Sequence, residues 1–237
     1  MIKTVLFDLD GTLLPMNQDN FTKMYFIKLA EKMAPLGYDR KQLVAGIGEG
    51  TMAMVKNDGS RQNEEAFWEK FTEIFGEKAL EDKPVVDDFY INEFREVISS
   101  CGYNEKAKAT VYKIKSMGFR VALATNPIFP AVATERRIRW TGLEPDDFEL
   151  YTTYENTGFC KPNPDYYWDV LERLNCRPEE CLMVGNDVTE DMIAGELGMK
   201  VFLLTDCMIS KEEKDISVYP NGSFDELLDY IEKINMI

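Results

Sequence analysis

The feature that most constrains the fold is an alternation of short apolar runs with helical segments in the second half of the chain. Three runs, at 120–126, 180–187 and 200–206, each follow a segment whose apolar residues recur at helical spacing. Strands that alternate with helices in this way form a parallel α/β sheet, and they read as nearly continuous apolar runs because both faces are buried. Two further strands are expected at 148–155 and over Val5 to Phe7. The pattern predicts an α/β fold whose core is a Rossmann-like, doubly wound parallel sheet.

The stretch between the first strand and the rest of the sheet has a different pattern. Its apolar residues recur at helical spacing, and it contains no convincing strand. We therefore expect an α/β core domain formed by 1–15 and 101–237, and an inserted α-helical domain formed by 16–100. The sequence GIGEG at 46–50 does not follow a strand, so we interpret it as a loop between two helices of the insertion.

The composition excludes several classes of protein. The 237 residues are 45% apolar, which is enough for a substantial core. No apolar stretch has membrane-spanning length and the first residues lack the features of a signal peptide, so we expect a cytoplasmic protein with no membrane partner. The formal charge of −15 argues against nucleic acid as a partner, because phosphate backbones are bound by clustered Lys and Arg.

The chain contains no histidine, and this restricts its chemistry. Ser-His-Asp and Cys-His catalysis are excluded, as is every His-ligated metal site. The five cysteines are odd in number and form no CxxC pair, so a zinc ribbon is not expected. Acid–base chemistry must rely on carboxylates, lysine, tyrosine or cysteine, and the metal that suits such a chain is a hard cation with oxygen ligands.

The first predicted strand runs directly into two aspartates. Val5 to Phe7 read as buried residues, and Asp8 and Asp10 follow at once. An unpaired carboxylate is so unfavourable in a core that such groups are normally paired, bound to a metal or placed at an opening. Gly11 then allows the backbone to turn sharply. The strand is therefore predicted to end at a functional site.

Other predicted strands also end in polar residues. The second ends in Thr125 and Asn126, and a later one ends in Asn186 and Asp187, with Asp191 four residues further on. Ligands of open α/β sheets bind at the carboxyl ends of the strands. We therefore expect these side chains to lie near the two aspartates of the first strand.

A lysine lies between these stretches along the chain. Lys161 stands in the sequence GFCKPNPDYY, ahead of a helix in which Asn163 is expected as the N-cap and Pro164 as the first residue. Tyr166 and Tyr167 either line the predicted site or pack in the core, and the sequence does not separate these two interpretations.

Taken together, the four stretches resemble the haloacid dehalogenase-like (HAD) superfamily. The matching residues are Asp8-Leu9-Asp10-Gly11-Thr12, Thr125 after a strand, Lys161 in KPNP, and the acids that follow MVG. Their order and spacing also match, and the helical insertion resembles the family's helical cap of the first type. The resemblance covers about 1–15 and 105–237.

The resemblance implies a role for each matching residue. Asp8 would attack phosphorus and form an aspartyl-phosphate. Asp10 would protonate the leaving oxygen and then activate the water that hydrolyses the intermediate. Thr125 would hydrogen-bond the transferred phosphoryl group, and Lys161 would offset charge at the nucleophile and the phosphate.

A Mg²⁺ site is also implied by the resemblance. Asp8 and the backbone carbonyl of Asp10 would hold the ion together with a group that follows a later strand. Many members of the superfamily have an aspartate where this chain has Asn186, so either Asn186 or Asp187 takes that ligand position. We favour Asp187, with Asp191 in the outer shell of the metal or paired with the lysine.

The remaining expectations concern substrate binding. Gly11, Thr12 and Asn126 are expected in the phosphate-binding loop beside the threonine already named. In the insertion, Lys56 and Arg61 are the cations to inspect for binding a second anionic group of the substrate, although solvated surface charges are their more ordinary interpretation. The sequence names neither the substrate nor the oligomeric state.

Asp10 bears on the class of reaction. An aspartate can accept a phosphoryl group covalently, and phosphoryl transfer relies on positioning and charge stabilisation. A halide leaves without a proton, whereas an alkoxide benefits from a general acid, so Asp10 favours phosphate esters over carbon–halogen bonds. We predict a Mg²⁺-dependent phosphatase of a small phosphorylated metabolite. The alternatives are a phosphomutase of the same superfamily and a non-enzymatic phospho-acceptor module similar to a receiver domain.

Overall fold

The computed structural model describes residues 1–210 and 215–235. Its centre is a parallel sheet of five strands in the order β2-β1-β3-β4-β5. The strands are β1 (Thr4–Phe7), β2 (Arg120–Leu123), β3 (Cys181–Gly185), β4 (Lys200–Leu204) and β5 (Asn221–Gly222). The predicted doubly wound parallel sheet is thereby confirmed. The chain leaves β1 in one direction to form β2 and returns past it to form β3, so the strand order reverses between β1 and β3.

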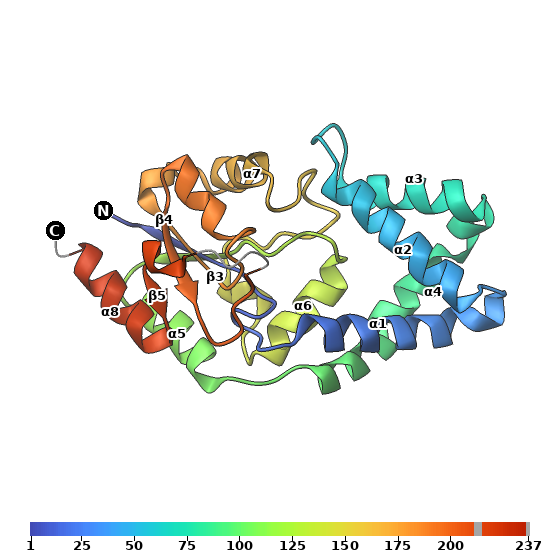
Figure 1. Ribbon diagram of the computed structural model, residues 1–237, viewed down its shortest axis with the longest axis horizontal. Coiled ribbons are helices and arrows are strands. Elements are labelled where there is room, and N and C mark those ends of the chain that lie inside the picture. Colours follow the sequence, from blue (N-terminus) through green and yellow to red (C-terminus); the bar gives the residue numbers. More distant parts are fainter. Residues whose placement is uncertain (211–214, 236–237) are drawn as a thin grey trace.

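Helices cover both faces of this sheet (Figure 1). Side chains of successive strand residues point to opposite faces, so Val5 and Phe7 pack in one apolar cluster and Leu6 in another. The first cluster includes residues of α5 (Glu105–Ser116), α6 (Ala131–Trp140) and α8 (Phe224–Asn235). The second includes residues of α7 (Pro164–Leu174) and of the 3₁₀ helix η5 (Met192–Leu197). The sheet is therefore buried on both sides, as the continuous apolar runs predict.

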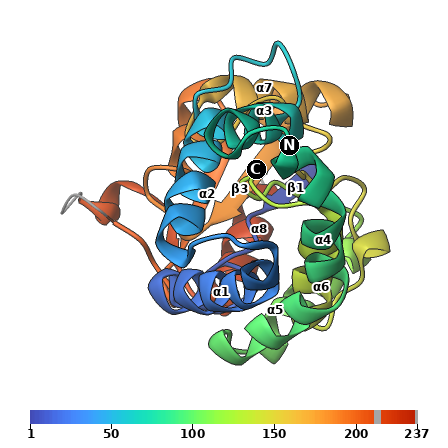
Figure 2. The same ribbon diagram turned by 90° about the vertical axis from the view of Figure 1, so that its right-hand side faces the viewer.

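The segment between β1 and α5 is helical and lies beyond one end of the sheet, as Figures 1 and 2 both show. It consists of α1 (Gln18–Met33), η1 (Ala34–Leu36), α2 (Arg40–Val55), α3 (Asn63–Phe75), α4 (Lys78–Ile91) and η2 (Glu93–Ser100). Its two ends lie side by side, because Met16 and Cys101 form an antiparallel bridge and Gly102 N donates to Pro15 O at 2.7 Å. The chain therefore enters and leaves this helical segment at one place.

The glycine-rich stretch in the insertion is helical. The loop expected at 46–50 is wrong, because the whole stretch lies inside α2. A Cβ atom on Gly46 would overlap the ring of Phe75, and one on Gly50 would overlap the ring of Phe67. The missing side chains let α2 and α3 approach closely, and this packing outweighs the low helix propensity of glycine.

The strand expected at 148–155 is also absent. Only one isolated bridge forms there, between Leu123 and Tyr151, although Leu123 N does donate to Leu150 O at 2.8 Å. The chain turns away two residues later, where Asn156 Oδ1 accepts a hydrogen bond from Thr153 N. An Asn side chain that binds nearby backbone groups favours a turn over a ladder.

Local signals elsewhere are reliable. Asn163 is the N-cap of α7, accepts a hydrogen bond from Asp165 N, and precedes Pro164 as the first helical residue, as predicted. Short 3₁₀ helices connect other elements: η3 (Pro145–Asp147), η4 (Pro178–Glu180) and η6 (Ile216–Val218). In the described ranges, no helix combines the length and the apolar character that crossing a membrane requires.

Candidate active site

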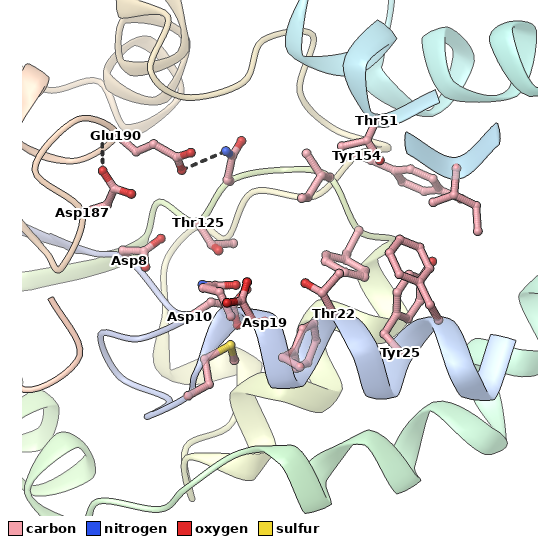
Figure 3. A pocket seen from close by; sticks show the side chains of 18 of the residues that line it. Asp8, Asp10, Asp19, Thr22, Tyr25, Thr51, Thr125, Tyr154, Asp187 and Glu190 are labelled. Atoms are coloured by element: carbon pink, nitrogen blue, oxygen red, sulfur yellow. Dashed lines mark hydrogen bonds between the residues drawn. The ribbon is translucent and has the colours of Figure 1, made fainter. Parts of the chain in front are cut away.

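The predicted site residues meet where the strand order reverses. Asp8 directly follows β1, and its backbone N–H continues the pairing with β3 by donating to Val184 O at 2.9 Å. Asn186 directly follows β3, and Thr125 lies two residues beyond the end of β2. Carboxyl ends of adjacent parallel strands lie at one edge, which is where ligands of such sheets bind. Figure 3 shows Asp8, Thr125 and Asp187 at one end of a common pocket.

Lys161 links the first strand to the loop after β3. Its side chain is 1% exposed, and its Nζ lies 3.0 Å from Asp8 Oδ1 and 2.7 Å from Asp191 Oδ1. Burial opposes the charge of the ammonium, but Asp191 and Asp8 outweigh that effect, so the pKa of Lys161 lies well above its ordinary value. Asp191 was expected either in the outer shell of the metal or paired with the lysine, and the structure contains the pair with Lys161.

The same burial acts on the carboxylates. It raises the pKa of Asp8, and the charge of Asp10 adds to this, while Lys161 acts in the opposite direction. It also raises the pKa of Asp191 to about 6 against the same opposing charge. One lysine is therefore insufficient to neutralise this group of carboxylates, and an additional cation would favour their ionised forms.

Asp191 is held under the loop that follows β3. Its Oδ2 accepts a hydrogen bond from Asp187 N at 2.9 Å. A Cβ atom on Gly185 would overlap the Asp191 carboxylate, so only glycine permits this approach. Asp191 therefore orients both the lysine and the loop.

Oxygen atoms suited to a hard cation converge next to Asp8. The Thr12 hydroxyl lies 3.2 Å from Asp8 Oδ2 and 2.9 Å from Asn186 Oδ1, so these two oxygens share one neighbour. Gly11 has φ = +87°, and a Cβ atom there would overlap the Asn186 amide. The glycine is thus required both for the turn and for the approach of Asn186 to the first strand.

Asp187 lies in the same pocket but has a different set of contacts. Its Oδ1 accepts hydrogen bonds from Thr189 N at 2.7 Å and Glu190 N at 2.9 Å. Among the described residues no group of three Cys, Asp or Glu side chains is arranged to hold a metal ion. The donors nevertheless fit Mg²⁺, which prefers oxygen ligands, takes few of them from protein and keeps several waters. Asp8 with Asn186 or Asp187 and a backbone carbonyl would form such a set.

Arg137 is a site residue that our reading of the sequence missed. It lies on α6 with no solvent exposure and donates from a terminal guanidinium nitrogen to Asp10 Oδ2. Asp10 Oδ1 is buried and has no hydrogen-bond partner in the described part of the chain. One oxygen of Asp10 is therefore held by Arg137, while the other has no partner among the described residues. The sequence did contain a signal for this residue, because Arg137 lies one turn after Ala133 and so places a charge on the apolar face of α6.

Glu190 is a second residue that the sequence did not point to. Its Oε2 accepts a hydrogen bond from Asn126 Nδ2 at 3.0 Å, and burial raises the pKa of Glu190 to about 7. Tyr167 donates to the backbone carbonyl of Glu190 at 2.8 Å, and Tyr166 donates to that of Thr125, also at 2.8 Å. Both tyrosines are fully buried, so of the two interpretations the structure supports packing, with the added task of orienting site loops.

The two cations singled out in the insertion do not belong to the pocket. Neither Lys56 nor Arg61 is among the residues that line it. Arg61 instead forms an exposed ion pair with Glu69 on α3. The interpretation of these cations as binding a second anionic group of the substrate is therefore wrong, because the chain directs them to the surface.

Comparison with known proteins adds to this picture. A family model described as haloacid dehalogenase-like hydrolase matches residues 2–198. The chain is 27% identical over 195 residues to pyrophosphatase PpaX of Bacillus cereus strain G9842, which covers 82% of this chain and 79% of that protein.

Solved structures share the fold at lower identity. The magnesium-bound HAD-hydrolase YfnB of Bacillus subtilis aligns with a TM-score of 0.56 and 18% identity, over 97% of this chain and 98% of that one. The 2-haloacid dehalogenase of Pseudomonas syringae pv. Tomato DC3000 aligns with a TM-score of 0.64 and 16% identity, over 98% and 99% of the two chains. Proteins with different named reactions thus share this architecture, and the choice between reactions rests on the site.

Proposed function

Because this chain belongs to the haloacid dehalogenase-like hydrolase family, we propose that it is a Mg²⁺-dependent phosphatase that acts on a small phosphorylated molecule through an aspartyl-phosphate. The observation that carries the proposal is the geometry of the two aspartates. Asp8 lies 3.0 Å from a buried lysine, and Asp10 has one oxygen held by Arg137 and one oxygen free. A nucleophile and a separate proton-transfer group are the two parts that hydrolysis of a phosphate ester needs.

The chemistry proceeds in two steps. Asp8 attacks phosphorus, the bond between phosphorus and the ester oxygen breaks, and Asp10 gives its proton to the departing oxygen. A water molecule then attacks the aspartyl-phosphate, Asp10 takes a proton from that water, and inorganic phosphate leaves as the Asp8 carboxylate is restored. Lys161 stays beside Asp8 throughout and offsets charge on the reacting oxygens.

Mg²⁺ would be held by Asp8, the backbone carbonyl of Asp10, and Asn186 or Asp187. When bound, it would neutralise negative charge that develops on the phosphoryl oxygens. The Thr125 side chain lines the same pocket and is available to donate to a phosphoryl oxygen. Its backbone carbonyl is already fixed by Tyr166 and Thr152, which orients the loop that carries it.

A carbon–halogen substrate fits this site less well. Asp10 is a proton-transfer group that a departing halide does not need. A phospho-acceptor module would not need it either, since such a module keeps its phosphoryl group. A phosphatase uses every group placed here, as would a phosphomutase, which also needs a proton-transfer group; release of inorganic phosphate distinguishes the two.

We also propose that 16–100 act as a cap domain over this site. Helices α1 to α4 lie beyond the end of the sheet that carries Asp8, and both connections to them pass at Pro15 and Gly102. A single crossing point is suited to a hinge. The magnesium-bound structure of YfnB reveals interdomain movement in that protein.

The test of the proposed reaction is a phosphatase assay of the purified chain with Mg²⁺ on p-nitrophenyl phosphate and a panel of phosphate esters. We expect turnover, complete loss of it in Asp8→Asn, and no release of chloride from a 2-chloroalkanoate. Asp225→Asn, an exposed Asp→Asn change on α8, is the matched control and should keep wild-type activity. Near-normal turnover by Asp8→Asn would contradict the proposed nucleophile, and chloride release would overturn the proposed reaction.

A further inference from the structure

The pocket that contains the catalytic aspartates continues far into the cap domain. It has a volume of about 920 Å³, at the upper end of the range for small-molecule sites. Figure 3 shows Asp8 and Asp187 toward one end and Tyr25, Thr51 and Tyr154 toward the other. The space beyond the phosphate position is therefore larger than a phosphoryl group and a short polar tail require.

The cap part of the wall is mainly apolar, although it includes a few polar residues: Asn17, Gln18, Asp19, Thr22 and Thr51. Aromatic and aliphatic side chains line it from all four cap helices, among them Leu29 of α1, Ile47 of α2, Trp68 and Phe71 of α3, and Val86 of α4. The Tyr25 and Tyr90 hydroxyls lie 2.8 Å apart and satisfy each other. The other polar side chains on this wall are uncharged apart from Asp19, so none of them offers a positive charge to a substrate.

The charged residues on the wall are all acidic. Within the described residues, no Lys or Arg lines the pocket, whereas seven carboxylates do: Asp8, Asp10, Asp19, Asp187, Glu190, Asp191 and Asp206. Lys161 is buried against Asp8, and Arg137 against Asp10, so both cations are committed at the phosphate end. A second anionic group on the substrate would find no cationic partner among the described cap residues that line the pocket, and transfer of an anion from water without such a partner is strongly unfavourable.

We propose that the leaving group of the substrate is uncharged and apolar, an aliphatic or aromatic alcohol whose carbon skeleton occupies the cap part of the pocket. This inference rests on the proposed function and adds the class of ester to it. It excludes pyrophosphate and short carboxylated phosphate esters as preferred substrates. The apolar walls would bind the carbon skeleton through burial of its surface, which makes no demand on polar partners.

The first experiment compares matched esters with the wild-type chain and Mg²⁺. A series of alkyl phosphates should show kcat/KM that rises about three- to fourfold per methylene until the pocket is filled. Hexyl phosphate should exceed 5-carboxypentyl phosphate, which differs by a terminal carboxylate, by about 100-fold or more. Pyrophosphate should be a poor substrate. Equal or higher kcat/KM for the carboxylated ester or for pyrophosphate would overturn the inference.

The second experiment places a cation on the wall. Thr51 lies on α2, is half-buried and lines the pocket, so Thr51→Lys should reduce the preference for hexyl over 5-carboxypentyl phosphate by about tenfold. Met52→Lys is the matched control, because Met52 is the next residue, is 46% exposed and does not line the pocket. It should leave the preference unchanged. A preference that stays constant in Thr51→Lys, or shifts equally in both variants, would contradict the assignment of this wall.

The common substrate p-nitrophenyl phosphate separates failure of the reaction from failure of the ester class. If it is not hydrolysed, the proposed phosphatase activity fails. If it is hydrolysed but anionic esters are preferred, the phosphatase activity stands and the apolar leaving group is wrong.

Discussion

Arg137 and Asp10 form an ion pair in which the arginine side chain is 0% exposed and the aspartate side chain 19% exposed. The guanidinium also donates to Thr134 Oγ1 at 3.3 Å, and its carbon lies 4.5 Å from the centre of the Phe129 ring. The orientation of Asp10 is therefore set by α6, a helix that also packs against α4 of the cap. The residue that we assign to proton transfer depends on a contact 127 positions away in sequence.

We predict that Arg137→Met and Asp10→Asn act on the same step. Each should reduce kcat on alkyl phosphates by about 10²–10³-fold, because general acid–base catalysis contributes on that scale. Both should affect p-nitrophenyl phosphate much less, since a good leaving group needs little protonation. The double variant should be no slower than the worse single variant, because residues that act through one contact are not additive.

Steady-state kinetics of the three variants on both classes of ester provides the measurement. Arg137→Lys is the conservative control and should recover only part of the activity, because an ammonium does not reproduce the planar fork of the guanidinium. Losses that add in the double variant, or equal losses on both classes of ester, would show that Arg137 is important for folding rather than for positioning Asp10.

The position of Asn186 leads to a prediction about metal affinity. Its amide oxygen shares the Thr12 hydroxyl with Asp8, whereas Asp187 Oδ1 is committed to two backbone N–H groups. We expect Asn186→Asp to lower the Mg²⁺ concentration for half-maximal activity, on the order of tenfold, because affinity for a hard cation rises with ligand charge. Asp187→Asn should have a smaller effect, since an amide oxygen can accept the same two hydrogen bonds.

Mg²⁺ titration of activity and of binding heat in both variants would decide between these ligands. Asn186 Nδ2 donates to Cys207 O at 2.7 Å, so Asn186→Asp is also expected to lower the thermal stability. A larger effect of Asp187→Asn would return the ligand position to Asp187, as the sequence alone suggested.

Glu190 leads to a prediction about pH. Burial raises the pKa of Glu190 from 4.5 to about 7, so between these values the folded chain binds more protons than the unfolded chain. Stability must then fall as the pH rises from 4.5 to 7. In metal-free wild-type protein, we expect Glu190 to lower the free energy of unfolding by on the order of 2 kcal/mol between pH 4.5 and 7. Glu190→Gln should lack this decrease. Urea unfolding at pH 5 and pH 7.5 measures it, and identical pH slopes in wild type and variant would refute it.

Movement of the cap domain is the last prediction. If both connections at Pro15 and Gly102 act as a hinge, binding of Mg²⁺ with a phosphate mimic such as vanadate should draw α1 to α4 toward the site. Small-angle scattering should then report a smaller radius of gyration for the complex than for the free chain. Asp8→Asn, expected to weaken formation of that complex, is the control. An unchanged radius in wild type under saturating ligand would exclude closure of the cap.

The sequence by itself determined the α/β class and the strand ends that carry the site. Val5 to Phe7 could be read as a strand because burial on both faces requires an apolar run, and Asp8 could be read as its functional end because an unpaired buried carboxylate is so unfavourable. The N-cap at Asn163 was also readable, because capping is a contact between residues close together in the chain.

Only the tertiary structure decided the features that depend on contacts between distant residues. From the sequence, the glycines of α2 predict a loop, because helix propensity carries no information about the partner on which a helix packs. In the structure they lie in a helix, against the rings of Phe67 and Phe75. The arrangement of the helices around the sheet likewise decides that Arg137 pairs with Asp10. It also decides that Lys56 and Arg61 lie outside the pocket. Charge and apolar character are properties of single residues, whereas a partner or a cavity wall exists only once packing has placed distant side chains together.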